Sequence, residues 1–484
     1  MGIKEKTGRR SFLKAGTTAL AGAFTGLQQG LTVFSEPKMS VRTSNSQKMV
    51  GCYSSVDEIL KNPKYIDALQ QKLGVNFLLC GSSIKMPEWL RGKNPLKNGM
   101  MHTQHTDDDS ALISAIEETK KRGMKFWLYF SGHHNSEDER GVMSETFEGI
   151  KFADLPPIKY CISQGELTTC FQKPAVREYE TALFGFASKN YEVDKMYVSH
   201  TRYATPSFWT NLFGCACSSC REEAYRLGYD FEKMKNSMQA LKKSLENLNR
   251  KTIENAAKAP MTFADFLSFT GENNGVADWL YCRAKIVGNA LKNINDTVHL
   301  STNERCGFVT DTHNAAMSLL IGHNFEDFIN GASDNFHPLS WCDYQHVSVV
   351  AAWANQLCEW APGLEEKTAL KVAASFFGWQ DIGLPSEKIS DLRIAASPKE
   401  YGIWGDPEKN FYSYFNPDLT IKLMIREWTK LAAINRGRIP AHPVIKGFEW
   451  PEKVCRELME RTIDIGLNGY VFQRTENLID KNKL

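Results

Sequence analysis

Three closely spaced cysteines are the residues of this sequence whose types and spacing best suit a defined chemistry. Cys215, Cys217 and Cys220 form the pattern C-x-C-x-x-C. This spacing lets three thiolates converge on one tetrahedral metal ion, for which zinc is the natural candidate. Cys161 and Cys170, in the loop predicted to follow the preceding strand, offer a fourth ligand. Four cysteine ligands leave no position open for water, so we expect a structural zinc that stabilises a loop.

The same five cysteines allow two other interpretations. In an exported protein they could form disulfides, because disulfides persist in oxidising compartments. They could also remain as small buried thiols, which pack like other apolar side chains. The spacing favours zinc and leaves both alternatives open.

A buried strand delivers polar residues just before this cysteine pattern. The apolar run Met196–Val198 is followed by His200, Arg202 and Tyr203, and a long loop then leads to the cysteines. In an α/β barrel, the loops at the carboxyl ends of the strands form the active face. The segment therefore predicts where the functional end of the protein lies.

Short apolar runs alternate with amphipathic helical segments along the chain, which is typical of βα units around a parallel sheet. Eight such units predict a (β/α)₈ TIM barrel with helical insertions after strands four (221–296) and six (345–438). The predicted strands are Met49–Tyr53, Val75–Cys80, Met124–Phe130, Met196–Val198, Val298–Thr302, Gly331–Asn335, Pro443–Phe448 and Gly469–Gln473.

The predicted strand ends carry aromatic, amide, histidine and carboxylate side chains, a combination that suits sugars. Carboxylates in a pair can perform acid/base or nucleophilic hydrolysis, and the three candidates are Glu304, Asp334 and Glu449. We expect Glu449 to be the nucleophile or base, with one of the other two as its partner. The predicted substrate-binding residues are His133, His134, Asn135, His200, Arg202, Tyr203, Asn303, His337, Trp450 and Gln473.

Each candidate carboxylate also has a purely structural interpretation. Glu304 precedes Arg305 and could form a local ion pair. Asp334 could cap a turn before the next helix. Glu449 stands just before a predicted helix and could favour its positive end.

Composition narrows the function classes further. A formal net charge of +2 over 484 residues does not indicate a nucleic-acid binder. The sequence contains no phosphate-binding loop, dinucleotide fingerprint or nucleophile elbow. A carbohydrate substrate is therefore the expected partner, while the oligomeric state is not indicated.

The first residues are typical of an export signal. Thr7–Lys14 is close to the twin-arginine pattern, and the apolar stretch after it is too short to remain as a membrane span. We expect residues 1–48 to be a twin-arginine signal peptide with a flexible leader, and residues 49–484 to be the barrel. The predicted partner is the twin-arginine export machinery, with a periplasmic or secreted product and no stable membrane anchor.

The order of the units, the segment ISAIEETKKRGMKFWLYFS and above all FGCACSSC resemble the TIM-barrel glycoside hydrolases. The chain is similar in particular to family-42-type β-galactosidases and related barrel glycosidases with a Cys-rich metal loop. This resemblance implies an acid/base Glu at the end of strand four, where this chain reads Ser199, His200, Thr201, Arg202. It also implies a strand-seven nucleophile, which maps onto Glu449.

The missing strand-four carboxylate keeps other functions open beside an exported glycoside hydrolase. One is a sugar-binding barrel without catalysis. Another is a polysaccharide lyase in which His200 or Tyr203 is the base and Arg202 holds a uronate. The reaction products distinguish these classes.

Overall fold

The computed structural model of the chain describes residues 48–95, 105–131, 141–155, 169–203, 212–259, 262, 265, 273–338, 342–383, 386–392, 417–448 and 450–480. The predicted export signal lies outside these residues. So do His133, His134, Asn135, Cys161 and Glu449. Within the described part, no helix combines the length and apolar composition needed to cross a membrane.

Eight parallel strands form one sheet in the order β6-β5-β4-β3-β2-β1-β8-β7. The two outer strands approach each other, because Phe336 of β6 donates its N–H to Pro440 O and accepts from His442 N. This contact makes the sheet a nearly closed (β/α)₈ barrel, as predicted. The strands are β1 (Met49–Ser55), β2 (Phe77–Gly81), β3 (Lys125–Ser131), β4 (Lys195–Ser199), β5 (Gly307–Thr312), β6 (Asn335–Pro338), β7 (Val444–Ile445) and β8 (Gly469–Phe472).

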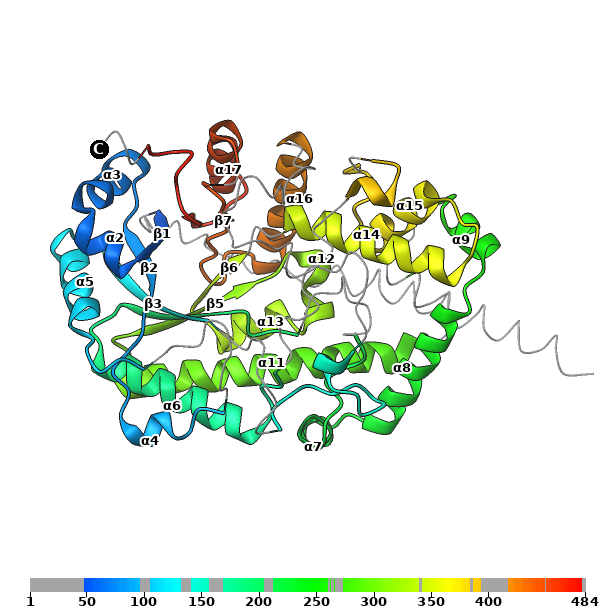
Figure 1. Ribbon diagram of the computed structural model, residues 1–484, viewed down its shortest axis with the longest axis horizontal. Helices are drawn as coiled ribbons and strands as arrows, with labels where there is room; N and C mark the ends of the chain where they lie inside the picture. Colours follow the sequence, from blue (N-terminus) through cyan, green and yellow to red (C-terminus); the bar gives the residue numbers. More distant parts are fainter. Residues whose placement is uncertain are drawn as a thin grey trace, which may run out of the picture. The chain divides into compact units, whose positions relative to one another are not determined.

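Helices cover the outer side of the strands (Figure 1). Their ends follow local rules: Pro63 begins α3, and Gly74 ends it with the positive φ of 69° that glycine adopts readily. The helices are α2 (Val56–Lys61), α3 (Pro63–Leu73), α4 (Glu88–Arg91), α5 (Ser110–Lys121), α6 (Pro174–Asn190), α7 (Ser218–Arg226), α8 (Phe231–Glu246), α9 (Arg250–Ala256), α11 (Asn273–Thr302), α12 (Ala315–Ser318), α13 (Phe325–Asp327), α14 (Cys342–Trp360), α15 (Glu366–Phe376), α16 (Pro417–Asn435) and α17 (Glu452–Asp464).

Both predicted insertions are helical. The first contains α7, α8 and α9 after β4, and α11 then returns to the barrel and packs against α6. The second contains α14 and α15 after β6, and these two helices pack on each other. The long connections therefore follow strands four and six, as expected.

The barrel interior has its own apolar core. Phe77, Trp127 and Val309 belong to it, and the rings of Phe77 and Trp127 stack with centroids 3.9 Å apart. Gly51 makes room for this stack, since a Cβ atom there would lie 2.3 Å from the Phe77 ring. Large apolar side chains thus fill the barrel interior between the strands. The polar groups lie nearer the carboxyl ends of the strands.

The predicted fifth strand, Val298–Thr302, is wrong, because these residues are the last turns of α11. Val298 and Thr302 are buried while Leu300 is 82% exposed. Residues four apart share a helix face, whereas a strand would place all three on one side. The true β5 begins at Gly307, and β6 overlaps the predicted sixth strand only at Asn335.

Candidate functional site

A buried carboxylate, Asp311, lies near the carboxyl end of β5. It is fully buried, and both of its oxygens accept the His200 backbone N–H, at 3.1 and 3.2 Å. The Tyr197 hydroxyl donates to it at 3.5 Å. Burial raises the pKa of Asp311 to about 7, although the nearby positive charge of Arg202 opposes this rise. A carboxyl group with such a pKa can give or take a proton near neutral pH.

Three tyrosines form a polar layer beside Asp311. Tyr53 donates its hydroxyl hydrogen bond to Tyr197 at 2.9 Å, and Tyr129 bonds Ser199 Oγ at 3.0 Å. Their rings are in mutual contact, with centroid distances of 5.2 to 6.2 Å. Burial raises the pKa of Tyr53 and of Tyr197 well above its ordinary value, so both remain neutral hydroxyl donors. Hydrogen bonds therefore connect Tyr53 through Tyr197 to the carboxyl group.

The polar segment after β4 divides between this site and the core. His200 has a φ of 63°, which directs its backbone N–H to Asp311, and its Nδ1 lies 2.5 Å from Ser199 Oγ. Arg202 is buried and donates to Tyr203 O at 3.1 Å. The Tyr203 ring instead packs on Phe171, at 5.0 Å. The structure thus brings the backbone of His200 and the charge of Arg202 to Asp311, and it places Tyr203 in the core.

Histidines at this end of the barrel are held neutral by burial. His337 pairs with Asp311 across β5 and β6, and its ring stacks on Trp127 at 5.3 Å and on Tyr197 at 5.2 Å. Burial lowers the pKa of His337 well below its ordinary value and that of His323 to about 3. Neither ring nitrogen of His337 has a hydrogen-bond partner among the described residues. His337 therefore lies beside Asp311, and its predicted role in substrate binding stays a prediction.

Two other predicted sugar-binding residues are Trp450 and Gln473. Trp450 is fully buried, with the Lys446 ammonium 5.9 Å from the centre of its ring. Gln473 follows β8 and donates its backbone N–H to Ile445 O at 2.8 Å.

Glu304, Asp334 and Asn303 lie at the opposite end of the barrel from the one predicted. They precede β5 and β6 in the chain, because both strands begin later than expected. Asp334 accepts from Phe308 N at 2.7 Å and lies 2.9 Å from His299 Nε2. The other His299 ring nitrogen pairs with Glu304, whose side chain is 77% exposed. These three residues belong to the turn that joins α11 to β5 and to the start of β6.

Sequence reasoning missed Asp311, although the signal was present. The segment Gly307–Thr312 reads GFVTDT, an apolar run that ends in polar residues. Choosing it as strand five would have placed Asp311, and not Glu304, at the carboxyl end. The three tyrosines were missed because the sequence does not show which side chains of β1, β3 and β4 point into the barrel.

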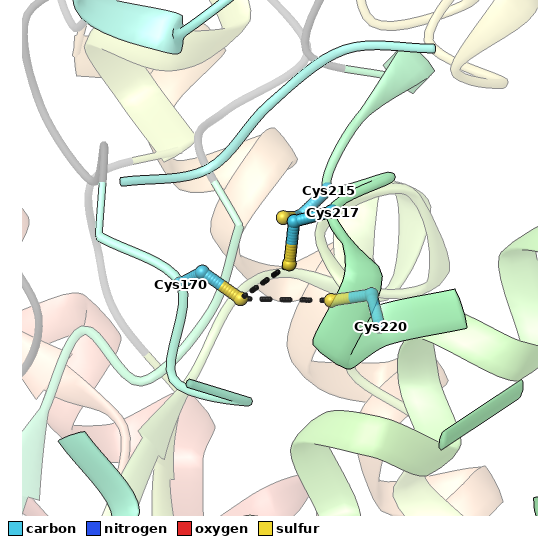
Figure 2. A group of neighbouring side chains, drawn as sticks. All are labelled: Cys170, Cys215, Cys217 and Cys220. Carbon is cyan, nitrogen blue, oxygen red and sulfur yellow. Dashed lines mark hydrogen bonds between the residues drawn. The ribbon is translucent and has the colours of Figure 1, made fainter. Parts of the chain in front are cut away.

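A four-cysteine centre lies beside this site. Cys170, Cys215, Cys217 and Cys220 are all buried, and their sulfur atoms lie within 4.8 Å of one another. Figure 2 shows Cys170 on one segment facing the cysteines of another, with Cys170 Sγ 3.8 Å from Cys217 Sγ and 3.5 Å from Cys220 Sγ. Thiolates at about 2.3 Å from a tetrahedral ion are about 3.8 Å apart, so the arrangement fits a metal ion. The cysteines whose side chains the structure describes form no disulfide, and the fourth member here is Cys170.

The centre connects two loops that follow neighbouring strands. Cys170 follows β3, while the other three cysteines follow β4. Phe171, next to Cys170, packs on Tyr203, whose backbone N–H donates to Ile321 O at 2.9 Å. The centre therefore holds the segment that contains His200 and Arg202 against the barrel.

No protein-family model matches the chain, and no curated protein matches it. Among solved structures, it is similar to the glycoside hydrolase domain of PgaB (BpsB) from Bordetella bronchiseptica. The identity is 8% and the TM-score 0.45, over 90% of this chain and 97% of that chain. It is also similar to the catalytic domain of β-amylase from Paenibacillus polymyxa, with 12% identity and a TM-score of 0.44, over 90% of this chain and 94% of that chain. The closer resemblance to family-42-type enzymes stays a prediction, and the function is argued from the site.

Proposed function

We propose that the chain is a carbohydrate-active hydrolase in which Asp311 is the general acid or base. The observation that carries this proposal is the fully buried Asp311 carboxyl group, whose pKa is raised to about 7 at the carboxyl end of a barrel strand. Active sites of TIM barrels lie at this end. A protonated carboxyl group there can donate to a glycosidic oxygen, which is the first step of glycoside hydrolysis.

The surrounding groups suit this role. The His200 backbone N–H and the Tyr197 hydroxyl orient the Asp311 carboxyl, and they also stabilise it once it has lost its proton. Arg202 supplies positive charge near the same group. The hydroxyls of Tyr53 and Tyr129 are donors and acceptors of the kind that sugar hydroxyls pair with.

A second carboxylate is needed for either stereochemical course of hydrolysis. Glu449 remains the candidate from the sequence, because it follows β7 in the chain and the carboxyl ends of the strands share one face. Glu449 is the proposed nucleophile or base, and Asp311 replaces Glu304 and Asp334 as its proposed partner.

We further propose that the four cysteines hold zinc. When bound, zinc supplies a structural crosslink between the two loops, since four thiolates leave no open position. The cysteines hold the loops, and Asp311 and its neighbours perform the proton transfer. Export through the twin-arginine route, to the periplasm or outside the cell, is proposed from the Thr7–Lys14 pattern alone.

Product analysis on defined oligosaccharides tests the function. Hydrolysis creates a new reducing end without a double bond, and this product should vanish in Asp311→Asn. Ultraviolet absorbance from an unsaturated sugar would instead identify a lyase. Binding without turnover would identify a sugar-binding barrel, and either result would overturn the proposal.

A further inference from the structure

A groove on the outer wall of the barrel lies apart from the residues discussed so far. It has a volume of about 970 Å³ and is bounded by α4, α6 and α11. Figure 1 shows α4 and α6 alongside the long helix α11, and α6 contacts both of the other helices. Gln172 and Pro174 line one end of it, and Lys189 and Asn190 line the other. The groove therefore follows α6 for its full 17 residues, which is about 25 Å of helix.

An exposed tryptophan stands at the side of this groove. Trp89 is 54% exposed, and its ring meets the edge of Phe186 at 6.4 Å and 81°. The Lys93 ammonium lies 5.9 Å from the centre of the same ring. These contacts orient the indole while leaving a large part of it open. An open aromatic surface beside polar groups is a platform on which the C–H faces of a sugar ring can stack.

Small and polar side chains of α6 and α11 line part of the groove. Gly185 lets α6 and α11 approach closely, because a Cβ atom there would lie 3.0 Å from Thr297 Cγ2. Asn293 lines the groove and donates to Thr181 Oγ1 at 2.8 Å, which keeps its amide in place. Small side chains and oriented amides are well suited to pair with hydroxyl groups.

Gln172 lies at one end of the groove. This residue is 5% exposed and lines the groove. Its side-chain amide carries both a donor and an acceptor, which are the groups that pair with a ligand hydroxyl. Gln172 lies two residues after Cys170, so this end of the groove is next to the cysteine centre.

The charges along the groove nearly cancel. Its lining includes four basic side chains, Lys93, Arg177, Lys189 and Arg226, and three acidic ones, Glu178, Glu180 and Glu223. Arg226 is already paired with Glu223, at 2.7 and 2.5 Å. A strongly charged polymer would be attracted by some of these side chains and repelled by others. A neutral ligand would not be repelled by any of them. The lining therefore favours a neutral ligand rich in hydroxyl groups.

We propose that this groove is a second carbohydrate-binding site, which holds a neutral glycan chain against Trp89 outside the barrel mouth. The choice of a glycan rests on the proposed function, while the groove, the open indole of Trp89 and the balanced charges of the lining stand without it. A site of this kind would retain a long substrate near the active end and would contribute nothing to the cleavage of a short one.

Native gel electrophoresis in neutral polysaccharides tests the site. The probes are hydroxyethylcellulose, soluble starch and glycol chitin, with polygalacturonate as a charged polymer. The protein carries Asp311→Asn so that hydrolysis does not remove the probe. We expect at least one neutral polysaccharide to retard it, and Trp89→Ala to raise the dissociation constant about tenfold, the effect of losing one stacking contact. Thermal unfolding should show that this exposed position leaves the fold unchanged.

Tyr281→Ala is the matched control, because Tyr281 is 51% exposed on α11 and does not line the groove. It should bind like the parent protein. Retardation by the charged polymer alone, no retardation at all, or equal losses in both variants would overturn the site.

Hydrolysis separates this proposal from the previous one. With Asp311 intact, Trp89→Ala should cleave short oligosaccharides at the normal rate. Normal cleavage without Trp89-dependent binding would reject the groove alone. Trp89-dependent binding without any cleavage would reject the hydrolase alone.

Discussion

The two ends of the barrel each hold an aspartate on or beside neighbouring strands, in opposite environments. Asp311 at the carboxyl end is fully buried, and its neighbours are a backbone N–H, a tyrosine hydroxyl and the charge of Arg202. Asp334 at the amino end has a side chain that is 26% exposed and is paired with His299 and with Phe308 N. The pKa of Asp311 is about 7, so this carboxyl group can gain or lose a proton near neutral pH. Asp334 instead accepts hydrogen bonds that stabilise the structure. Proximity to a barrel strand thus does not make a carboxylate catalytic, because its surroundings decide the role.

Of the substitutions that test the difference between the two ends, Asp311→Asn should have the largest effect, and this effect is on turnover. The amide preserves size but cannot transfer the proton, so turnover should fall by about 10²- to 10⁴-fold, the usual contribution of a general acid or base. Steady-state kinetics on a verified oligosaccharide measures this fall. Glu304→Gln at the amino end is the control and should keep normal turnover. Equal losses of turnover in the two variants would contradict the assignment of catalysis to the carboxyl end of the barrel.

Cys220→Ala should have the next largest effect. It removes one of four convergent thiols, so the variant should lose its metal and several kcal/mol of unfolding free energy, since structural metal sites contribute folding energy directly. Elemental analysis and urea unfolding measure both quantities, with one zinc per chain expected in the parent. Cys455→Ala is the control, because Cys455 is also buried but is not part of the centre. A metal-free parent protein, or equal metal contents in both variants, would contradict the assignment.

The dependence of stability on pH should differ between wild type and Asp311→Asn. The folded pKa of Asp311 is about 7, above the unfolded value of about 3.9, so the native state binds more protons between these values. This group should therefore make the protein less stable as pH rises from about 4 to about 7, by a few kcal/mol.

Urea unfolding of both proteins at pH 5 and pH 8 measures the difference. The buried histidines contribute with the opposite sign, since their folded pKa values are lowered, and subtracting the variant removes their share. A difference between the two proteins that does not change with pH would show that Asp311 does not titrate as stated.

Asp334→Asn should have the smallest effect. It weakens the hydrogen bonds to His299 and Phe308 N, which should cost about 1 kcal/mol of unfolding free energy. Turnover per folded molecule should remain normal, because the residue is at the amino end. Parallel unfolding and kinetic measurements check both statements, and a large loss of turnover with normal stability would contradict them.

Much of the fold could be predicted because strong local signals mark it. The apolar runs of β1 to β4 and the stop at Gly74 are readable without tertiary information. The error at strand five arose because Val298, Leu300 and Thr302 alternate with polar residues as in a strand, whereas the segment forms the end of a helix of 30 residues. Because β5 and β6 begin later in the chain than predicted, Glu304 and Asp334 lie before the strands and not after them.

The metal centre was easier to find than the acid. Three of its cysteines are close in sequence, and the pattern alone indicates their convergence. The fourth, Cys170, is 45 residues before Cys215, and only the packing of two loops brings it to the other three. Asp311 is marked in the sequence only by its place at the end of a short apolar run, and its raised pKa results from burial in the folded structure.

The left-handed backbone of His200 sets limits on which residues that position can accept. Its N–H reaches Asp311 because φ is 63°, a conformation that glycine and asparagine adopt at little cost and β-branched residues do not. Position 200 therefore contributes to the site through its main chain as well as its imidazole. In a library of variants, glycine or asparagine should be recovered there far more often than valine or isoleucine, even though all four lack the ring.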